Sequence, residues 1–310
     1  MREGSRKFEA GVMATPYSLA ELSRELAQAA EIGGQAVVSV HGRPQVPSSG
    51  ILWRDGVVVT TDHTLKRHED ITITRPNGEN AAATLAGRDA GTDLAVLRVP
   101  ENGAAAAKTA DEASLKAGNL VLALGRRGEN GVTVSFGVVS AIGAAWRTWR
   151  GGAIDRFIRP DVSIYVGFSG GALVDVEGRV IGVNTSALTR GSGVTIPAST
   201  VTRVVDDLLT RGHVRRGYLG VGLHPVELPG GKPGLIVLSV EPEGPAAKAG
   251  VFVGDVLVAL EGEPVADTDD VQAHLDGDRV GRAIAVELVR GGAAVTLTII
   301  PGERRPGGER

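Results

Sequence analysis

The sequence predicts a mainly β protein, with a larger antiparallel β region followed by a smaller α+β module. Glycine supplies 44 of the 310 residues and aromatic residues only 4%, a balance that favours short strands and many turns. From Gly34 onward the apolar runs are short and are separated by Gly, Asn and Asp. They lack the regular strand–helix alternation of a parallel sheet. A chain of this length has room for two domains.

The first periodic segment, residues 18–31, belongs to an N-terminal extension that we place at residues 1–32. Ser18 followed by Glu21 has the spacing of a capping box, and Leu19, Leu22 and Leu26 fall on one helical face. We therefore expect a helix docked on the body of the protein. An oligomer contact is the alternative.

Residues 33–211 form the larger region, whose apolar runs are typical of antiparallel strands. The strand candidates are QAVVSVHG, SGILWRDGVVVTTDH, ITITRP, AAATLAGRD, TDLAVLRV, NLVLALG and GVTVSFGVVSAIG. Asp55-Gly56, between two such runs, predicts a hairpin. The segment STVTRVVDDLLTRG predicts a closing helix from about Ser199 to Arg211.

A second module begins at about HVRRGYLG and spans residues 214–302. Its strand candidates are GLIVLSV, GDVLVALEG and AIAVELVR, and its short helical candidates are PAAKAG and TDDVQAHLDG. The last eight residues, 303–310, read ERRPGGER and predict a flexible, solvated tail.

Composition excludes several classes of function. A formal charge of −3 gives no electrostatic case for nucleic acid or an anionic membrane as the main partner. There are no cysteines, so disulfides, thiolate catalysis and Cys-ligated metals are excluded. His63 and His68 lack a third ligand, so we expect no metal. Neither a signal peptide nor a long apolar stretch is evident, which predicts a cytoplasmic protein.

Ser169 lies inside GFSGG, residues 167–171, with two apolar runs behind it. The pattern G-x-S-x-G also describes the nucleophile elbow of α/β-hydrolases, which requires a helix directly after the serine. Here two β runs follow, with a turn at Gly178, so the elbow interpretation fails. Glycines instead favour an oxyanion site, because they let backbone N–H groups approach a carbonyl closely. The donors would be the N–H groups of Gly167 and Ser169.

A serine nucleophile needs a general base and an orienting carboxylate. Of the six histidines, His63 ends a well-formed β run, VVVTTDH, and Asp93 stands at the start of the apolar strand in GRDAGTDLAVLRV. The order His63, Asp93, Ser169 is that of the chymotrypsin type. Taken singly, each residue also has a purely structural interpretation, as a turn serine, a strand-end histidine or a strand-entry charge.

Four segments in order resemble the HtrA/DegP-like serine proteases. VVVTTDHTL resembles their histidine motif, GRDAGTDLAVLRV their aspartate motif and GFSGGALVDVEGRVIGVNT their serine motif. RRGYLGVGL followed by GPAAKAGVFVGDVLVALEGEPV resembles the PDZ domain that these proteases carry. The resemblance covers about residues 35–302 and implies a trypsin-like double β-barrel followed by a PDZ domain.

The resemblance implies that Ser169 is the nucleophile, that His63 is the general base and then the acid, and that Asp93 orients the imidazole. Peptide bonds in unfolded or exposed polypeptides would be cleaved through an acyl-enzyme, without ATP, metal or another cofactor. Two departures leave open whether the oxyanion loop rests in a competent geometry. Where the family commonly has Asn-Pro-Gly-Asn, this chain has Val166 in place of the proline and Phe168 in place of the second asparagine. The alternative is an inactive protease fold that serves as a chaperone or PDZ adaptor.

The resemblance also implies two binding regions. Ala187 and Leu188 would line a small apolar pocket for the side chain before the scissile bond. In the PDZ domain a peptide C-terminus or extended segment would add a strand beside Val221–Leu223. The loop of Gly217, Tyr218, Leu219 and Gly220 would hold the carboxylate, with Val271 and Leu275 as a groove wall. The alternative is that these apolar side chains fill the core of the module.

The segment from Ala144 to Phe157 places Trp146, Arg147, Trp149 and Arg150 close together. Alternating aromatics and cations can bind single-stranded nucleic acid, but the acidic balance of the chain argues against it. The segment stands where the family carries a sensor loop, so Arg147 or Arg150 would pass on occupancy of the PDZ domain. A solvated loop with one tryptophan against the barrel is the alternative. The family also implies a homo-oligomer, often a trimer.

Overall fold

The computed structural model describes residues 18–101, 103, 105–128, 131–189, 191, 193–275 and 277–303. Residues 1–17, which bear on the predicted absence of a leader, and most of the predicted tail lie outside this part of the chain. Within it, no helix is both long and apolar enough to cross a membrane.

Helix α1 spans Leu19–Gly34, so it begins one residue later and ends three residues later than the sequence predicts. The predicted capping box is confirmed, because Ser18 and Glu21 exchange side chain–backbone hydrogen bonds. Only the second half of the helix packs closely: Ala29 is buried, whereas Leu19 is 85% exposed. Gly33 is required there, because a Cβ would lie 2.9 Å from a methyl carbon of Val174.

Six antiparallel strands close into the first barrel, in the order β1-β2-β3-β6-β5-β4. The predicted hairpin at Asp55-Gly56 is confirmed, with Gly56 at φ 73°. The strands are β1 (Val37–His41), β2 (Ser48–Arg54), β3 (Val57–Thr61), β4 (Ile71–Thr74), β5 (Asn80–Asp89) and β6 (Leu94–Arg98), with the 3₁₀ turn η1 (Asp62–Thr64) after β3.

The second barrel is also closed and antiparallel, in the order β11-β14-β13-β12-β7-β8. Its strands are β7 (Leu120–Arg126), β8 (Val132–Gly143), β11 (Phe157–Asp161), β12 (Ala172–Val174), β13 (Val180–Thr185) and β14 (Val194–Pro197). The turn η2 (Glu112–Ser114) precedes it, and the small pair β9 (Trp146–Arg147) and β10 (Ala153–Ile154) extends from it. Helix α2 (Ala198–Arg211) follows, one residue earlier than predicted.

The largest apolar cluster lies between the two barrels and under α2. It joins Val59 and Val96 of the first barrel to Leu124 and Val183 of the second, and α2 closes it with Val201, Val204, Val205 and Leu208. Each barrel also has its own interior cluster. Because burial of apolar surface is the main stabilising term in folding, this shared core fixes the two barrels against each other.

The C-terminal module is a separate sheet with its own core. Its strands are β15 (Gly217–Tyr218), β16 (Val221–Leu228), β17 (Lys232–Val240), β18 (Val256–Leu260), β19 (Glu263–Pro264), β20 (Ile284–Arg290), β21 (Ala293–Ile299) and β22 (Gly302–Glu303). The helices are α3 (Pro245–Lys248), α4 (Thr268–Ala273) and the 3₁₀ turn η3 (Gly277–Arg279). Glu303 was assigned to the flexible tail, and this was wrong: it pairs with Gly217 in β22 and forms an ion pair with His213.

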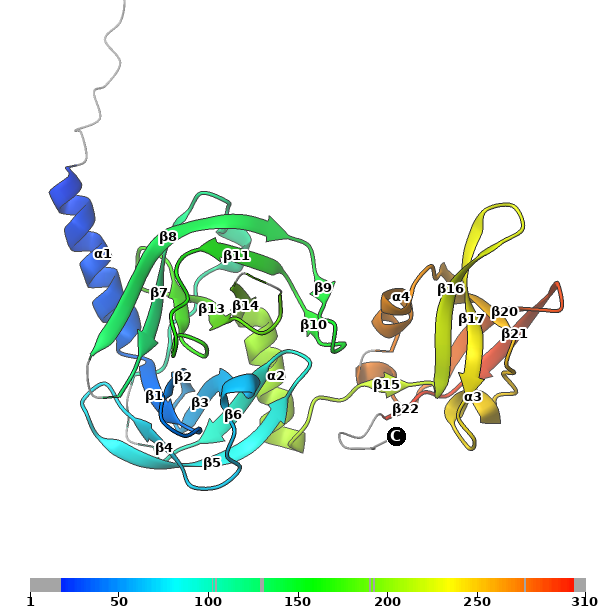
Figure 1. The fold of residues 1–310 in the computed structure, drawn as a ribbon, viewed down its shortest axis with the longest axis horizontal. Helices are drawn as coiled ribbons and strands as arrows, with labels where there is room; N and C mark the ends of the chain where they lie inside the picture. Colours follow the sequence, from blue (N-terminus) through cyan, green and yellow to red (C-terminus); the bar gives the residue numbers. More distant parts are fainter. Residues whose placement is uncertain are drawn as a thin grey trace, which may run out of the picture.

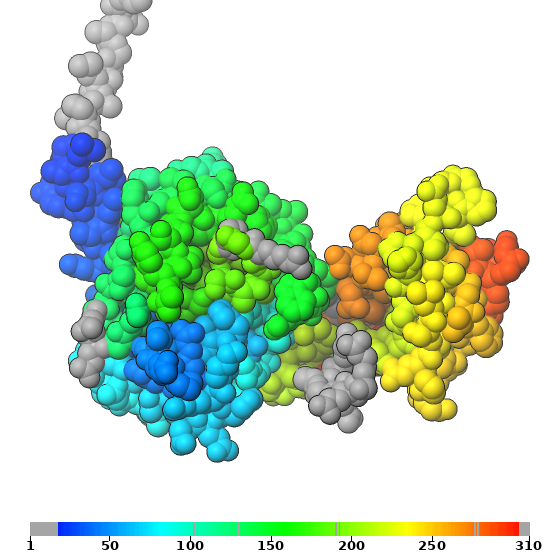
Figure 2. All heavy atoms as spheres, viewed as in Figure 1, coloured from blue at the N-terminus to red at the C-terminus, as the bar shows by residue number. Residues whose placement is uncertain are grey.

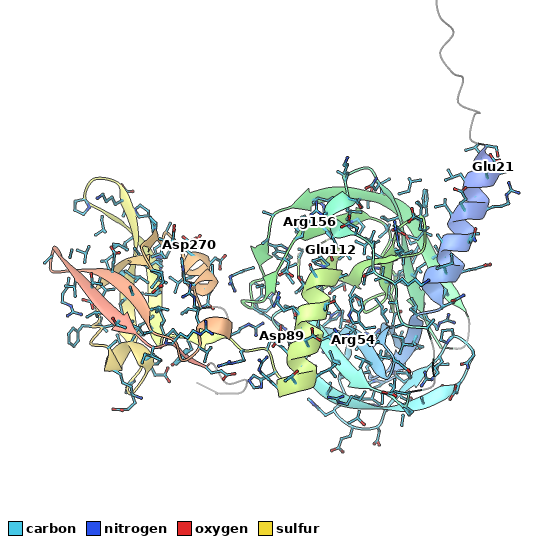
Figure 3. All side chains as sticks on the ribbon, turned by 180° about the vertical axis from the view of Figure 1, so that it is seen from behind. Glu21, Arg54, Asp89, Glu112, Arg156 and Asp270 are labelled. Atoms are coloured by element: carbon cyan, nitrogen blue, oxygen red, sulfur yellow. The ribbon has the colours of Figure 1, made fainter. Side chains whose placement is uncertain are left out.

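The barrels and the C-terminal module form two masses in the space-filling view (Figures 1 and 2). They are joined through the end of α2 and a linker, residues 212–216, that leads to β15. Asp89 lies on the side of the barrels that faces the module, as the view from behind shows (Figure 3). Arg216 of the linker makes an ion pair with it at 2.8 Å. The chain between the two bodies is therefore tied directly to the first barrel.

Candidate active site

Strand pairing in the first barrel brings His63 and Asp93 together. β3 and β6 are antiparallel with Thr61 opposite Leu94, so the residues after β3 and before β6 lie side by side. His63 lies in η1, and the N–H of Asp62 donates to the carbonyl of Asp93 (3.0 Å). Two residues that are thirty positions apart are thus neighbours because of register.

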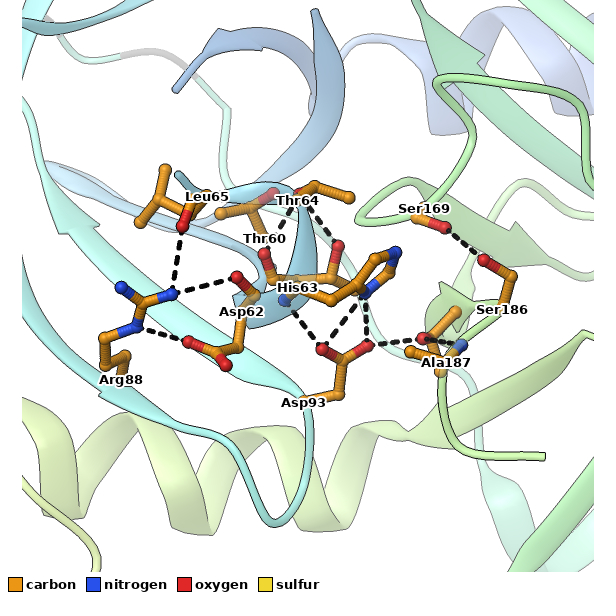
Figure 4. Close-up of polar contacts among 12 residues, drawn as sticks. Thr60, Asp62, His63, Thr64, Leu65, Arg88, Asp93, Ser169, Ser186 and Ala187 are labelled. Carbon is orange, nitrogen blue, oxygen red and sulfur yellow. Dashed lines mark hydrogen bonds and ion pairs between the residues drawn. The ribbon is translucent and has the colours of Figure 1, made fainter. Parts of the chain in front are cut away.

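The carboxylate of Asp93 holds the imidazole of His63 in one orientation (Figure 4). Its Oδ2 lies 2.8 Å from Nδ1 of His63, and its Oδ1 accepts the backbone N–H of His63 at 2.9 Å. The hydroxyl of Thr185 also donates to Oδ2. Since an ionised carboxylate only accepts, Nδ1 carries the hydrogen and Nε2 is left to accept a proton. Asp93 is 3% exposed, so water competes little for these bonds.

Arg88 fixes the turn that carries His63. Its guanidinium contacts the carboxylate of Asp62 and donates to the carbonyls of Asp62 (3.0 Å) and Leu65 (2.9 Å). Three acceptors on one planar donor group leave η1 little freedom to rotate. Sequence reasoning missed Arg88, although its place in the aspartate motif, close to Asp93, was a signal that could have been used.

Ser169 lies in the loop before β12 and is largely buried. Within the described residues, its Oγ is paired with Oγ of Ser186 at 3.3 Å. Ser186 follows Thr185, which bonds Asp93, so Ser169 is linked to the His63–Asp93 pair through two consecutive residues at the end of β13. In Figure 4 the imidazole is turned toward the side on which Ser169 lies. Sequence reasoning missed both Thr185 and Ser186.

Among residues 167–171, two backbone N–H groups have no hydrogen-bond acceptor within the described part of the chain. The N–H of Phe168 donates to Tyr165, that of Gly170 to Asn184 and that of Gly171 to Phe168, at 2.8–2.9 Å. The N–H groups of Gly167 and Ser169 are left over, and these are the two that the sequence predicts as oxyanion donors. Gly170 has φ 88°, and a Cβ there would lie 2.1 Å from the carbonyl oxygen of Ser49.

Comparison with known proteins gives this arrangement a family. Two family descriptions match the chain, a trypsin-like peptidase domain over residues 48–183 and a PDZ domain over residues 217–300. A probable periplasmic serine endoprotease DegP-like of Brucella suis biovar 1 is 34% identical over 289 residues, 87% of this chain. The crystal structure of the serine endoprotease from Yersinia pestis is 31% identical, with a TM-score of 0.76, over 94% of this chain and 100% of that chain. The chain belongs to the HtrA/DegP-like serine proteases.

A solved structure of the HtrA-type protease AlgW with a decapeptide has a TM-score of 0.79 at 27% identity and covers 91% of this chain. The chain spans 56% of the length of the Brucella relative. The two six-stranded barrels followed by a PDZ domain are the architecture that the sequence predicts, and the predicted fold class is confirmed.

The two predicted pocket residues of this HtrA-like chain have different surroundings. Ala187 is exposed, and its N–H donates to the hydroxyl of Thr185 at 3.1 Å. Leu188 is buried and belongs to the cluster between the barrels. Both follow β13 closely in the chain, after Ser186, and of the two only Ala187 is exposed.

The predicted peptide-binding residues of the PDZ domain lie in or next to β15, the start of β16 and α4. Gly217 and Tyr218 form β15, Gly220 has φ 78°, and Val221–Leu223 begin β16, which lies at one edge of the sheet. Leu219, Val271 and Leu275 are buried in the core cluster of the domain, the last two at 3% exposure. Val221 and Leu223 pack against that cluster from the side. Val271 and Leu275 therefore fill the core, which is the alternative that the sequence left open.

The Trp146–Arg150 segment divides into a packed half and an exposed half. The ring of Trp146 meets that of Phe157 edge-on at 5.7 Å, whereas Trp149 is 74% exposed beneath the guanidinium of Arg150 (4.4 Å). Between them, the hydroxyl of Thr148 donates to the carbonyl of Gly91 at 2.7 Å. The segment thus touches the loop that ends at Asp93. With Arg216 and α4, it lines a cleft of about 1060 Å³ between the barrels and the PDZ domain.

Metal ligands do not gather in the part of the chain that the structure describes. Among those residues, no group of three or more His, Cys, Asp or Glu side chains is placed to hold a metal ion.

Proposed function

We propose that this chain is an ATP-independent serine endopeptidase that cleaves unfolded or exposed polypeptides. Two observations together carry the proposal. Asp93 orients His63, and Ser169 lies in the segment of residues 167–171, where the N–H groups of Gly167 and Ser169 have no acceptor within the described residues. Membership of a protease family supports the same activity. The set fits acyl transfer, which needs a nucleophile, a base and an oxyanion site together.

In the first half-reaction, Nε2 of His63 removes the proton of Ser169 as Oγ attacks the carbonyl carbon of the scissile bond. The bond from Ser169 to Ser186 gives way to one with His63 as the substrate arrives. The carbonyl oxygen becomes negative and is stabilised by the N–H groups of Gly167 and Ser169. His63 then gives its proton to the departing amine nitrogen, which leaves an ester on Ser169.

In the second half-reaction, water takes the place of the amine. His63 removes a proton from that water, the resulting hydroxyl attacks the ester carbon, and Oγ leaves as the proton returns to it. Asp93 stays ionised throughout and stabilises the positive imidazolium. The products are a new C-terminal carboxylate and a free Ser169.

The test compares wild type with Ser169→Ala. We expect a fluorophosphonate probe to label wild type and not the variant, and turnover of casein to fall by about 10⁴-fold or more. Labelling that persists in the variant would place the reactive group elsewhere. An unlabelled wild type with no turnover would favour the alternative, an inert protease fold that acts as a chaperone or adaptor.

Cleavage-site mapping tests the substrate preference. We propose a short aliphatic side chain before the scissile bond, because Ala187 is small and apolar and Leu188 is next to it in the chain. Arg or Lys at that position in the cleaved products would contradict the proposal.

We also propose that the PDZ domain takes a peptide C-terminus or an extended segment as an added strand on β16. The position of β16 at one edge of the sheet, with β17 on its other side, supports this, because an edge strand has unpaired N–H and C=O groups. The AlgW structures with a tripeptide and a decapeptide show that relatives bind peptides. Val221→Pro would remove one edge N–H and should weaken peptide binding in a fluorescence-polarisation titration.

The Trp146–Arg150 segment is proposed to carry the signal of peptide binding to the catalytic loops. Arg147 and Arg150 line the interdomain cleft, and Thr148 contacts the loop of Asp93. If the double substitution of Arg147 and Arg150 to Ala left peptide stimulation of hydrolysis unchanged, the segment would have no such role.

A further inference from the structure

The loop that supplies the proposed oxyanion donors has one large apolar side chain that is fully buried, and this is Phe168. It lies between Gly167 and Ser169 and points into the interior of the second barrel. Its neighbours in that cluster are Leu115, Val121, Ala123, Val139, Ile158, Leu173 and Ile181. The ring of Tyr165 packs against it edge-on at 5.3 Å. A residue that the catalytic reaction does not use is therefore the most deeply buried part of the loop.

The barrel wall is shaped for this ring. Gly125 of β7 faces it, and a Cβ at that position would lie 2.6 Å from Cδ1 of Phe168, well inside van der Waals contact. Protein interiors are close-packed, so a ring with a matching glycine opposite it has one place to lie. Phe168 and Gly125 are thus complementary in shape.

Ser49 holds the backbone on either side of the same ring. Its hydroxyl donates to the carbonyl of Gly167 at 2.7 Å and accepts the N–H of Arg126 at 2.9 Å. Its own N–H donates to the carbonyl of Ser169 at 3.2 Å. The peptide units before Phe168 and after Ser169 are therefore both fixed to the end of β2.

The direction of one oxyanion donor follows from these contacts. The carbonyl of Phe168 accepts the N–H of Gly171 at 2.8 Å. In a trans peptide the N–H points opposite to the carbonyl, so the N–H of Ser169 points away from Gly171 and out of the loop. If the ring of Phe168 left its place, this peptide plane would be held only by the hydrogen bonds of Gly171 and Ser49, and the donor would be less firmly directed.

We infer that Phe168 is a positioning residue, whose burial against Gly125 holds the N–H groups of Gly167 and Ser169 in their oxyanion-binding orientation. The inference rests on the proposed peptidase function. Packing here takes the place of the polar side chain that the family commonly has next to this serine.

The experiment measures kcat and KM on a peptide substrate, and affinity for a peptide boronate that mimics the tetrahedral intermediate. We expect Phe168→Ala to lower kcat and boronate affinity by about 10- to 100-fold with little change in KM, because a misdirected donor loses part of the 10²–10³-fold effect of one oxyanion hydrogen bond. Ile158→Ala is the control, since it removes a buried side chain of the same cluster that comes from β11 and not from the loop. It should lower the melting temperature and leave kcat within about 2-fold of wild type.

A second pair of variants guards against misfolding of Phe168→Ala. Gly125→Ala should push the ring and lower kcat, and Gly125→Ala/Phe168→Leu should recover part of the loss, because the smaller side chain makes room for the new methyl group. Kcat values for Phe168→Ala and Phe168→Leu equal to that of Ile158→Ala would overturn the inference while leaving the peptidase intact. A wild type that neither turns over substrate nor labels with fluorophosphonate would overturn the proposed function, and this inference with it.

Discussion

At the scale of single residues, the candidate active site depends on one carboxylate and the three groups that donate hydrogen bonds to it. Asp93 accepts from Nδ1 and the backbone N–H of His63 and from the hydroxyl of Thr185. Its backbone has φ 58°, a left-handed conformation that aspartate tolerates better than most residues. The contacts that hold this conformation are also the ones that aim the imidazole.

Replacing Thr185 tests that dependence. Thr185→Val keeps the shape of the side chain but removes the hydroxyl that donates to Asp93, so the carboxylate loses one of its orienting bonds. A hydrogen bond to a charged group contributes about 1.5–3 kcal/mol, which predicts a fall in kcat/KM of roughly 10-fold or more. Steady-state kinetics would measure it. Thr185→Ser, which restores the hydroxyl, should recover most of the rate; equal loss in both variants would contradict the role.

At the scale of elements, the 3₁₀ turn η1 carries His63, the proposed general base, and Arg88 holds this turn in place. Arg88→Leu removes the contacts to Asp62 and Leu65, so we expect kcat/KM to fall by about 10-fold, on the order of one charge-assisted bond. Arg54→Ala is a matched control. It removes the same charge from an exposed ion pair with Asp206, a kind of pair that contributes about 0–1 kcal/mol. Equal kinetic effects of both variants would exclude a role for the turn.

The PDZ domain has its own charged support, in which Arg290 bonds the buried carboxylate of Asp255 through Nε and Nη2 at 2.7 Å. Hydrogen bonds from Arg290 hold the pKa of Asp255 below its ordinary value of 3.8. A lowered carboxyl pKa contributes stability that is present above pH 3.8 and is lost as the pH falls through the folded pKa.

Acid unfolding of the domain should therefore depend on Asp255. Thermal unfolding followed between pH 5 and about pH 3 should show a steeper loss for wild type than for Asp255→Asn, which lacks the titrating group and should already be less stable at pH 5. Glu177→Gln, at an exposed position, serves as the control. Parallel curves of melting temperature against pH for wild type and Asp255→Asn would show that the Asp255–Arg290 pair does not contribute to the loss of stability in acid.

At the scale of the whole molecule, the sequence predicted the elements better than the contacts between them. Local signals were sufficient for the capping box of α1, the Asp55-Gly56 hairpin and most of the strand segments. The residues that support the site were missed because register decides them. Thr185 meets Asp93 across ninety-two positions and Ser49 meets Gly167 across one hundred and eighteen, and nothing in either stretch alone marks them. Val271 was ambiguous for the same reason: an apolar position on a short helix fits a groove wall and a core equally well.

One link between the two bodies runs through the loop of the first barrel at residues 89–93. Nη2 of Arg216, on the linker, lies 2.8 and 2.9 Å from the two carboxylate oxygens of the buried Asp89. Asp89 in turn accepts the N–H and hydroxyl of Thr92, the residue before Asp93. Arg216 of the linker is therefore connected through Asp89 to Thr92, the residue before Asp93, which is the proposed catalytic carboxylate.

Arg216→Ala should break that link. The ratio of kcat/KM with a saturating peptide ligand of the PDZ domain to kcat/KM without it should move toward 1 in the variant. Coupling between two sites requires a structural element whose equilibrium both sites bias, and the variant breaks that element. Leaving Asp89 buried with fewer partners should also lower the stability of the barrels by about 1–3 kcal/mol. Arg211→Ala is the control, since Arg211 pairs with Asp207 on its own helix. A peptide response that is as large in Arg216→Ala as in Arg211→Ala would mean that the signal reaches Asp93 by another route, of which the contact from Thr148 to Gly91 is the nearest.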